Sequence, residues 1–495
     1  MAKYTHTDIS QIFYASNGGF KAGRDPMGIQ NSSVATYSEL LPGLTNLTGH
    51  IRYYSIYCLL LNEYDSLEKG GKTGIPHQYN FLRRAELIIA YIMRNQNIGA
   101  VIGSDFTGYK DGTIRNGDSY DIARGADYKS SRDRSTYWSY PTGAFGQYYL
   151  GSLIYCRLVK IEADRFYLLT AGRHLAQALA DSLDPRLWQR FTGCVIKGHL
   201  TSDDITELQP LGLRGIVSNS PEWVALNRLL TAPDENGSTL RRDTIRLLLN
   251  DLRDGIGRDE FVRHRFLCHR VGDPADNAAF GWYFYFMCEV LHYCIETLLC
   301  YILSRIDALR NPPVETLIDD AAGRICALLT NATRPVAEQF DTLRSFIKER
   351  RYDQAAAAAT ELLTALRLEY NDNREAVTSF EQRHRLNRQH GILSEGLDSF
   401  VGSSGSLTQL TDLRKIIRRV MNEHTLVAVS KMGNSDADLR KFILEDGCAV
   451  LVEMRYPTGT SPRIRSLYNF LTDLGYIGND GALTPIANEF IENFR

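Results

Sequence analysis

One apolar stretch constrains the fold of this chain more than any other segment: AAFGWYFYFMCEVLHYCIETLLCYILS, residues 278–304. As a helix it is long enough to cross a bilayer. However, Glu289, His292 and Glu296 lie near its middle, and a charged side chain at the centre of a membrane costs on the order of 3 kcal/mol. The sequence therefore predicts a helix buried on all sides in a protein core, and no contact with a membrane.

Composition and charge support a globular protein without a dominant electrostatic partner. The chain has 495 residues, 44% of them hydrophobic, which predicts about three domains. Lys+Arg 56 balance Asp+Glu 58, so contact with nucleic acid requires a local basic patch. The nine cysteines form no C-x-x-C motif, and the first residues, MAKYTHTDIS, lack the apolar core of a signal peptide. Both features favour reduced thiols and a cytoplasmic location.

Helical periodicity dominates the chain, so we expect a mainly α fold: a large multi-helical body followed by a winged-helix (α+β) domain. The expected domains are a mostly helical one at 1–200 with a long polar loop at 99–143, and a second helical one at 201–393. A Gly- and Ser-rich linker is expected at 394–409, and the winged-helix domain at 410–495.

The winged-helix prediction rests on the stretch SPRIRSLYNFLTDLGYIGNDGALTPIANEF, residues 461–490. Ser461 is expected to cap a helix and Pro462 to take its first position, while Gly475 ends it. The NDG turn then predicts a small two-stranded wing, followed by a closing helix. A hairpin at Asp446-Gly447 precedes this stretch.

In a DNA-reading winged helix, the helix before the wing enters the major groove. Its expected solvent face carries Arg463, Arg465, Ser466 and Asn469. Arginine can pair with guanine and asparagine with adenine. Lys441 is expected to hold phosphate, together with Lys431, Arg440 and Arg455. Leu467, Phe470 and Leu471 are expected to be buried. Asp473 and Asp480 argue against DNA contact, so docking to protein is the alternative interpretation.

The polar loop holds carboxylates and a lysine in the pattern of a Mg²⁺-dependent nuclease. Asp105, Asp118 and Asp121 are the candidate catalytic acids, and Lys129 is the candidate partner of the nucleophile. A solvated loop with scattered charges is the alternative, because such acids normally lie at strand ends. We found no Walker A, G-x-S-x-G, H-E-x-x-H or G-x-G-x-x-G motif in the sequence.

A metal site is a further candidate on the apolar helix. Cys288, His292 and Glu296 share helical spacing, and their side chains are ligands that zinc or iron accepts. The alternative is a core histidine beside a buried carboxylate, because no paired C-x₂-C or H-x₃-H arrangement accompanies them. We therefore expect no bound cofactor.

Three basic runs offer local positive charge: FVRHRFLCHR at 261–270, QRHRLNRQH at 382–390 and RKIIRR at 414–419. They could neutralise phosphates, in which case binding would depend strongly on salt. The alternative is a solvated helix face with acidic neighbours.

Two stretches carry a resemblance to a known group. DPMGIQ with LPGLTNLTGHIRYYSIYCLLL, residues 25–61, and VAVSKMGNSDADLRKFILEDG with TSPRIRSLYNFLTDLGYI resemble large bacterial proteins that accompany anti-phage defence gene clusters. The resemblance implies defence and a multi-protein assembly, and carries over no catalytic residue. The expected function is a non-catalytic subunit, sensor or scaffold with other protein subunits as partners and DNA as a further candidate. A metal-dependent nuclease using the 103–143 loop and a stand-alone DNA-binding regulator are the alternatives.

Overall fold

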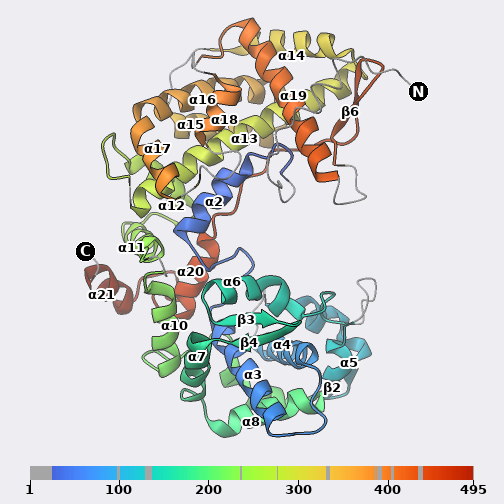
Figure 1. The fold of residues 1–495 in the computed structure, drawn as a ribbon, viewed down its shortest axis with the longest axis vertical. Coiled ribbons are helices and arrows are strands. Elements are labelled where there is room, and N and C mark those ends of the chain that lie inside the picture. The colour runs from blue at the N-terminus through green and yellow to red at the C-terminus, as the bar shows by residue number, and fades with distance from the viewer. Residues whose placement is uncertain are drawn as a thin grey trace. The chain divides into compact units, whose positions relative to one another are not determined.

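The fold is mainly helical, as predicted (Figure 1). The structure is a computed structural model. It describes residues 25–96, 101–128, 136–234, 237–275, 277–330, 335–384, 386, 393–402, 406–432 and 439–493.

The chain forms two compact units, and each is assembled from separate stretches of sequence. Unit 1 comprises residues up to Leu40 and Asp259–Pro462, and unit 2 comprises Leu41–Arg258 and Arg463–Arg495. The chain therefore passes from one unit to the other three times. This division differs from the expected domains, because residues 25–40 join a unit formed mostly by the second half of the chain.

Unit 1 is a helical assembly packed around one long helix, α13 (Ala278–Leu309). The neighbours of α13 in this unit are α2 (Gln30–Leu40), α12 (Phe261–Cys268), α14 (Val314–Leu328), α15 (Val336–Lys348), α16 (Tyr352–Asp372), α17 (Arg374–Arg383), α18 (Leu393–Phe400) and α19 (Leu410–Met432). The alanine-rich α16 lies directly against α13, where small side chains let the two backbones approach closely.

The apolar stretch that opened the sequence analysis forms α13. This helix is long and apolar enough to cross a membrane, and its most apolar window is completely buried inside the structure. The helix is surrounded by protein because all sides of it carry large hydrophobic residues.

A β-hairpin completes unit 1 and confirms the predicted turn. Strands β6 (Phe442–Glu445) and β7 (Cys448–Leu451) pair in antiparallel fashion. Asp446 and Gly447 connect them with φ of 48° and 77°, the left-handed values that a two-residue hairpin turn requires. The expected linker is partly wrong: its first residues belong to α18, whose Leu397 and Phe400 are buried in the core.

Unit 2 is also largely helical. Its longest helices are α3 (Arg52–Lys69), α4 (Gln78–Asn95), α8 (Pro185–Lys197) and α11 (Leu240–Arg253). Shorter helices are α5 (Ile122–Ala126), α6 (Leu150–Tyr155), α7 (Thr170–Ala180), α9 (Ser202–Glu207), α10 (Pro221–Thr231), α20 (Ile464–Asp473) and α21 (Pro485–Asn493). The segments η1 (Phe106–Lys110) and η3 (Phe145–Tyr149) are π-helical turns, and η2 (Asp111–Thr113) and η4 (Gln209–Leu211) are 3₁₀ turns.

Two small antiparallel sheets add strands to unit 2. One has the order β1 (Arg115–Asn116), β2 (Ser119–Asp121), β5 (His199–Thr201), and the other pairs β3 (Val159–Glu162) with β4 (Arg165–Leu168). Strands β1 and β2 of the first sheet and helix α5 lie within the expected polar loop, so this region is more regular than its glycines and charges indicated.

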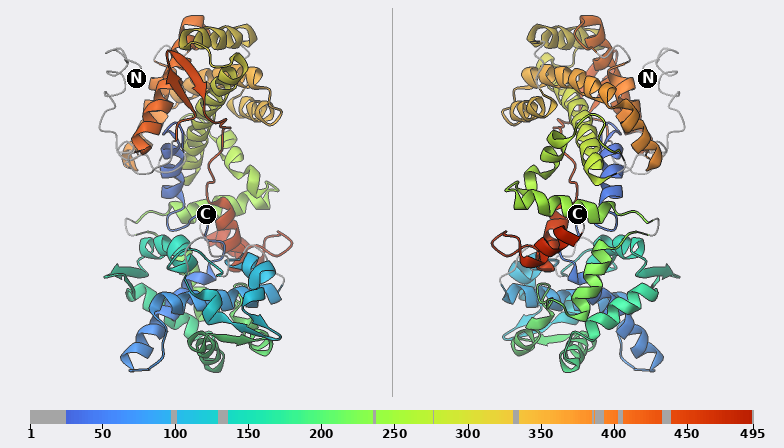
Figure 2. Two further views of the ribbon diagram at one scale, coloured as in Figure 1. Left: turned by 90° about the vertical axis from the view of Figure 1, so that its right-hand side faces the viewer. Right: turned by 90° about the vertical axis from the view of Figure 1, so that its left-hand side faces the viewer.

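The C-terminal region is divided between the units. Helix α19 and the hairpin belong to unit 1, whereas α20 and α21 belong to unit 2, beside α10 and α11 (Figures 1 and 2). Within 463–493 the predicted local order is present: a helix, a short hairpin bridged at Ile477 and Leu483, and a closing helix. The structure does not confirm a winged-helix domain over 410–495.

Candidate functional site

Unit 1 contains a buried polar group of three residues on α13, which we call the clasp: Glu289, His292 and Glu296. They lie at positions i, i+3 and i+7, so one face of the helix carries all three. His292 is 0% exposed and Glu296 is 2% exposed. A buried charge is costly unless it is compensated, so the neighbours of these residues decide what the clasp does.

His292 lies between the two carboxylates. Its Nε2 is 3.1 Å from Glu296 Oε1, and its Nδ1 is 3.7 Å from Glu289 Oε2. These are ion-pair distances without the alignment of a hydrogen bond. Burial by itself lowers the pKa of His292, but the two adjacent carboxylates outweigh it and raise the pKa to about 10. His292 is therefore a buried imidazolium at neutral pH.

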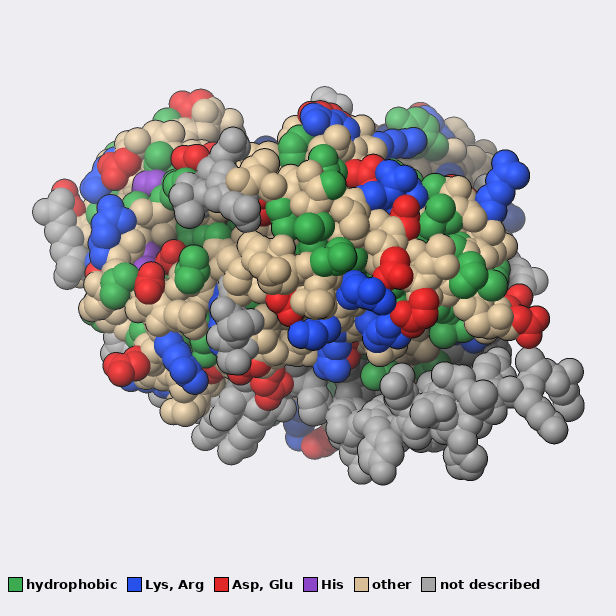
Figure 3. Space-filling model, turned by 90° about the horizontal axis from the view of Figure 1, so that it is seen from above, with side chains coloured by type: hydrophobic (Ala, Val, Ile, Leu, Met, Phe, Trp, Pro, Cys, Tyr) green, Lys and Arg blue, Asp and Glu red, His purple; other side chains and the backbone are tan. Residues whose placement is uncertain are grey.

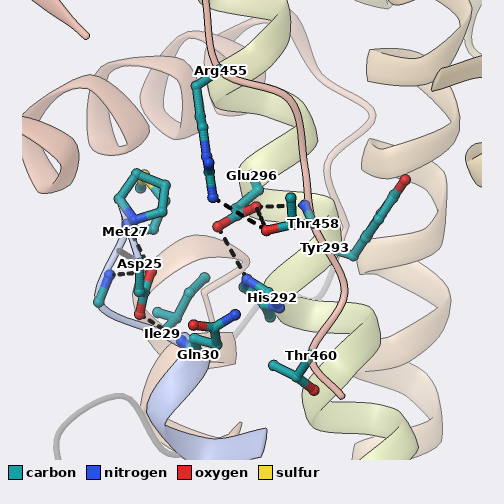
Figure 4. Close-up of polar contacts among 12 residues, drawn as sticks. Asp25, Met27, Ile29, Gln30, His292, Tyr293, Glu296, Arg455, Thr458 and Thr460 are labelled. Carbon is teal, nitrogen blue, oxygen red and sulfur yellow. Dashed lines mark hydrogen bonds and ion pairs between the residues drawn. The ribbon is translucent and has the colours of Figure 1, made fainter. Parts of the chain in front are cut away.

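Both carboxylates also bind a second segment, residues 452–462, which we call the strap. Figure 4 shows the contact between Glu296 and Thr458. Glu296 Oε2 accepts the backbone N–H of Thr458 at 2.8 Å, and Glu289 Oε1 accepts the backbone N–H of Thr460 at 2.6 Å. The Thr460 hydroxyl lies 2.6 Å from Glu289 Oε2 and 2.7 Å from the Tyr285 hydroxyl. Since the strap lies outside any helix or strand, these side chains supply partners that a sheet would otherwise provide.

The pKa of Glu289 follows from the same contacts. Burial by itself raises the pKa of this carboxyl, but His292 and Thr460 outweigh burial and lower it below the ordinary value. Glu289 is therefore an ionised carboxylate beside the His292 imidazolium at neutral pH. The chemistry of the clasp is to hold two backbone N–H groups of the strap.

The candidate metal ligands are not assembled. Cys288 is buried on α13 beside Ser32 and Thr36 of α2, and burial raises the pKa of its thiol far above the ordinary value. His292 and Glu296 instead face each other and the strap. Within the described ranges, the His, Cys, Asp and Glu side chains form no group of three or more that could hold a metal ion.

The candidate nuclease acids likewise form no group of three ligand side chains within the described residues. Asp105, Asp118 and Asp121 are all exposed. The Asp121 side chain accepts the backbone N–H of Arg124 at 3.0 Å, so it caps the short helix α5. Lys129 lies outside the described residues.

Two residues of α4 that the sequence analysis missed hold the far end of the polar loop. The buried guanidinium of Arg83 donates to three backbone carbonyls, of Ala126 at 2.5 Å, Trp138 at 2.8 Å, and Tyr140. One turn further on, the fully buried carboxylate of Glu86 accepts N–H groups of Ala144 at 3.0 Å and Phe145 at 2.6 Å. The sequence does contain a signal for these two residues. They are charged, lie three positions apart, and share a helix face that is otherwise apolar.

Glu86 also binds tyrosine. It accepts hydroxyls of Tyr57, at 2.8 Å, and Tyr137. Burial raises the pKa of Glu86, and the hydrogen bonds from the two tyrosines and two backbone N–H groups oppose this. Arg83 and Glu86 thus order an irregular segment by satisfying its backbone, which is a structural role.

The C-terminal helix α20 is fixed within unit 2 by its own polar groups. Asp473, at its end, accepts the backbone N–H of Ile51 and lies 3.1 Å from His50 Nδ1. Just beyond it, the indole N–H of Trp223 donates to the Leu474 carbonyl at 2.8 Å, and the Tyr476 hydroxyl donates to Asn227 at 2.6 Å. Asp473 was expected at the surface, and is instead buried.

The expected recognition face is present in part. Leu467, Phe470 and Leu471 are buried and Arg465 is exposed, as predicted, and Asn469 is half-buried. The expectation that Ser466 faces solvent is wrong, because this side chain is buried. The helix begins at Ile464 rather than at Pro462, because Arg463 adopts φ of 63°, a left-handed conformation. Its N–H donates to Asn46 and its guanidinium to the Leu41 carbonyl, so Arg463 is half-buried and bound within unit 2 rather than fully exposed.

The candidate phosphate contacts fall in the other unit. Lys441 pairs with Glu453, Lys431 donates to the Asp25 carbonyl, and Arg455 donates to Thr458 at 3.2 Å. Lys441 therefore belongs to unit 1, whereas Arg463, Arg465 and Asn469 belong to unit 2.

The basic run on α19 is largely neutralised by acidic neighbours. Arg414 lies 3.0 Å from Asp319, Arg418 lies 2.7 Å from Glu315, and Lys415 lies 3.0 Å from Asp412. In Figure 3, Lys and Arg side chains lie next to Asp and Glu side chains on the face shown. In the run at 261–270, Arg263 pairs with Asp341 at 2.9 Å. Most of the run at 382–390 lies outside the described residues.

No protein-family model matches this chain, and neither a curated protein nor a solved structure matches it.

Proposed function

We propose that this protein is a non-catalytic subunit, a sensor or scaffold, of a bacterial multi-protein defence assembly, and that it contacts DNA through the outward face of α20. The observation that carries the DNA part is the exposure of Arg465, with Asn469 one turn further along the same helix. The assembly and defence parts rest on the sequence resemblance.

Helix α20 has two features of a reading helix. Arginine pairs with two atoms of guanine and asparagine with two atoms of adenine, so Arg465 and Asn469 are suitable residue types. The helix is followed by a short hairpin and a second helix, the order found in winged-helix proteins.

Rigid attachment supports this proposal. The inner face of α20 packs on unit 2, where the Phe470 ring lies 5.8 Å from the Tyr54 ring. Asp473 and Tyr476 add hydrogen bonds at the end of the helix. A helix held in this way presents its outer side chains with little loss of conformational entropy on binding.

DNA binding is tested by fluorescence anisotropy with short duplexes and the full-length protein. Arg465→Ala should weaken binding by about 1–3 kcal/mol and reduce discrimination between duplexes. The matched control is Lys415→Ala, which removes an exposed positive charge that pairs with Asp412 in unit 1. Absence of binding by the unaltered protein, or equal effects of both variants, would overturn the DNA part.

The assembly part needs its own experiment. The unaltered protein should copurify with products of neighbouring genes when they are expressed together. If Arg465→Ala loses a protein partner and the unaltered protein does not bind DNA, the outward face of α20 docks protein instead. A protein that captures neither DNA nor a neighbouring gene product would contradict the whole proposal.

A further inference from the structure

The hairpin of unit 1 has one paired edge and one open edge. On the side of β7, Ala449 N–H donates to the Pro312 carbonyl at 2.9 Å, and Val314 N–H donates to the Gly447 carbonyl at 3.0 Å. On the other side lies β6, and no described strand other than β7 pairs with it. The outer edge of β6 is therefore a place where a further strand can add to the sheet.

The register of the hairpin determines which backbone groups of β6 face outward. Val452 N–H donates to the Lys441 carbonyl at 2.9 Å, so Lys441 is one of the positions that are bonded to the neighbouring strand. In an antiparallel pair, bonded and non-bonded positions alternate. The N–H and C=O groups of Phe442 and Leu444 therefore point away from β7, and no hydrogen bond between described residues uses them.

The side chains along β6 also leave apolar surface uncovered. Leu444 is 45% exposed, and Ile443 is half-buried. An exposed apolar edge strand is a template for another strand, which gains backbone hydrogen bonds and apolar contacts together. The occupant of this edge should therefore be an extended segment with apolar side chains at its centre.

The strand itself meets this description, because its sequence from Lys441 to Glu445 is KFILE. Two copies can pair in antiparallel fashion with Ile443 opposite Ile443 of the second copy. Phe442 then lies opposite Leu444 of the second copy, and these are the positions whose backbone groups face outward. The register of β6 and the alternation of hydrogen bonds therefore agree at this edge.

The charges at the two ends of β6 fit the same register. Lys441 lies opposite Glu445 of the second copy, and by symmetry Glu445 lies opposite its Lys441, so both ends carry an opposite-charge pair. Lys441 already pairs with Glu453 of its own chain, and its ammonium group has three donors, so it can contact both carboxylates. A strand with other charges at its ends would meet repulsion here, which makes the edge selective.

We infer that the outer edge of β6 binds a second copy of this chain, with the Lys441–Glu445 segments of the two copies paired in antiparallel fashion about Ile443. The pairing has two-fold symmetry and joins the two hairpins into one four-stranded sheet, so it closes as a dimer. The inference concerns unit 1 alone and does not depend on whether α20 binds DNA.

Sedimentation velocity of the full-length protein over a range of concentrations tests the pairing. The unaltered protein should form a reversible dimer. Glu445→Lys and Lys441→Glu each place like charges opposite each other and should raise the dimer dissociation constant at least about tenfold. The matched control is Asp307→Lys, which makes the same charge change at an exposed position near the end of α13 and should leave the constant unchanged.

A one-to-one mixture of the two variants provides the decisive result. In a mixed dimer of Glu445→Lys with Lys441→Glu, every opposite pair is again a lysine and a glutamate. Association should therefore return to within a few fold of the unaltered protein. A monomeric unaltered protein, an unchanged constant in Glu445→Lys, or a mixture that associates no better than its components would overturn the inference.

Hydrogen–deuterium exchange places the contact on this edge. At concentrations where the unaltered protein is dimeric, the Leu444 amide should be protected, and it should lose protection at least about tenfold on dilution. The Ile443 amide, which is bonded to β7, should stay protected throughout. A dimer in which the Leu444 amide exchanges freely would show that the copies associate through another surface.

Discussion

At the scale of single residues, unit 1 is distinguished by a charged histidine in its interior. His292 is enclosed by protein and compensated by Glu289 and Glu296, whose remaining oxygens bind the strap. Removing one member of such a group lowers the stability of the fold, because the remaining charges stay buried without compensation. This holds even where the intact group adds little net stability.

We therefore expect His292→Gln to reduce the free energy of unfolding by about 3–5 kcal/mol. Glutamine and histidine have similar sizes, so the decrease in the free energy of unfolding reflects the lost charge more than a change in volume. Urea denaturation of both proteins at pH 7 measures it. Arg324→Gln is the control, since this exposed arginine pairs with Asp320 at the surface of α14, where an ion pair contributes little. Equal stability of His292→Gln and the unaltered protein would show that the charge is not needed.

The stabilisation should also depend on pH in a defined direction. The pKa of His292 is raised from 6.5 to about 10 by the carboxylates, against the opposing effect of burial. Its contribution is therefore fully present below pH 6.5 and is lost as the pH rises through about 10. The stability difference between the unaltered protein and His292→Gln should shrink over this range. A difference that stays constant up to pH 10 would contradict a folded-state imidazolium.

At the scale of helices and strands, the sequence predicted an element correctly where the signal lies within the element itself, such as its periodicity or its turn residues. The apolar helix at 278–304 and the Asp446-Gly447 hairpin both occur close to their expected positions. The start of α20 was misplaced, because Arg463 takes a left-handed conformation that its contacts with Leu41 and Asn46 stabilise. These partners are more than 400 residues away, so no local pattern could show them.

The candidate sites were less predictable than the helices. The spacing of Glu289, His292 and Glu296 identified a shared helix face, but it could not show that Thr458 and Thr460 complete the group. Arg83 and Glu86 were missed because their partners are mainly backbone groups of an irregular segment, which carries no sequence signature. Residue types revealed which helix face was polar, while long-range contacts determined its role.

The buried face of α20 gives a direct prediction. Phe470 is 1% exposed and contacts Tyr54, so Phe470→Ala should destabilise unit 2 by about 3–5 kcal/mol. Arg465→Ala, on the exposed face, should change stability by less than about 0.5 kcal/mol. Chemical denaturation followed by tryptophan fluorescence compares them. A large loss in Arg465→Ala would mean that the helix is rotated from the position described.

Helix α4 gives a second prediction at this scale. Arg83→Ala leaves the carbonyls of Ala126, Trp138 and Tyr140 without their donor and should cost about 2–4 kcal/mol. Arg124→Ala is the control, because Arg124 is exposed in the same region. Limited proteolysis near Tyr140 should accelerate in Arg83→Ala and not in Arg124→Ala. Similar cleavage rates in both variants would show that Arg83 does not order this segment.

At the scale of the whole molecule, the two units are discontinuous in sequence. Domain boundaries predicted from the sequence fall where the composition changes, for example at the Gly- and Ser-rich stretch. The two units are instead defined by contacts between residues that are far apart in the sequence. Helix α2 joins α13 in unit 1, and α20 joins α3 and α10 in unit 2. The C-terminal residues are accordingly part of the core of unit 2, which is also what gives the Arg465 face its rigid support.

Removal of residues 463–495 tests this arrangement. The deletion exposes the sites of Leu467, Phe470, Leu471 and Tyr476, each fully buried. At about 1.5–3 kcal/mol for each side chain, the loss approaches the about 5–15 kcal/mol that stabilises a whole domain. Hydrogen–deuterium exchange should show loss of protection in α3 and α4 of unit 2, with α16 of unit 1 still protected. Unchanged protection in α3 and α4 would show instead that the C-terminal residues form a separate domain.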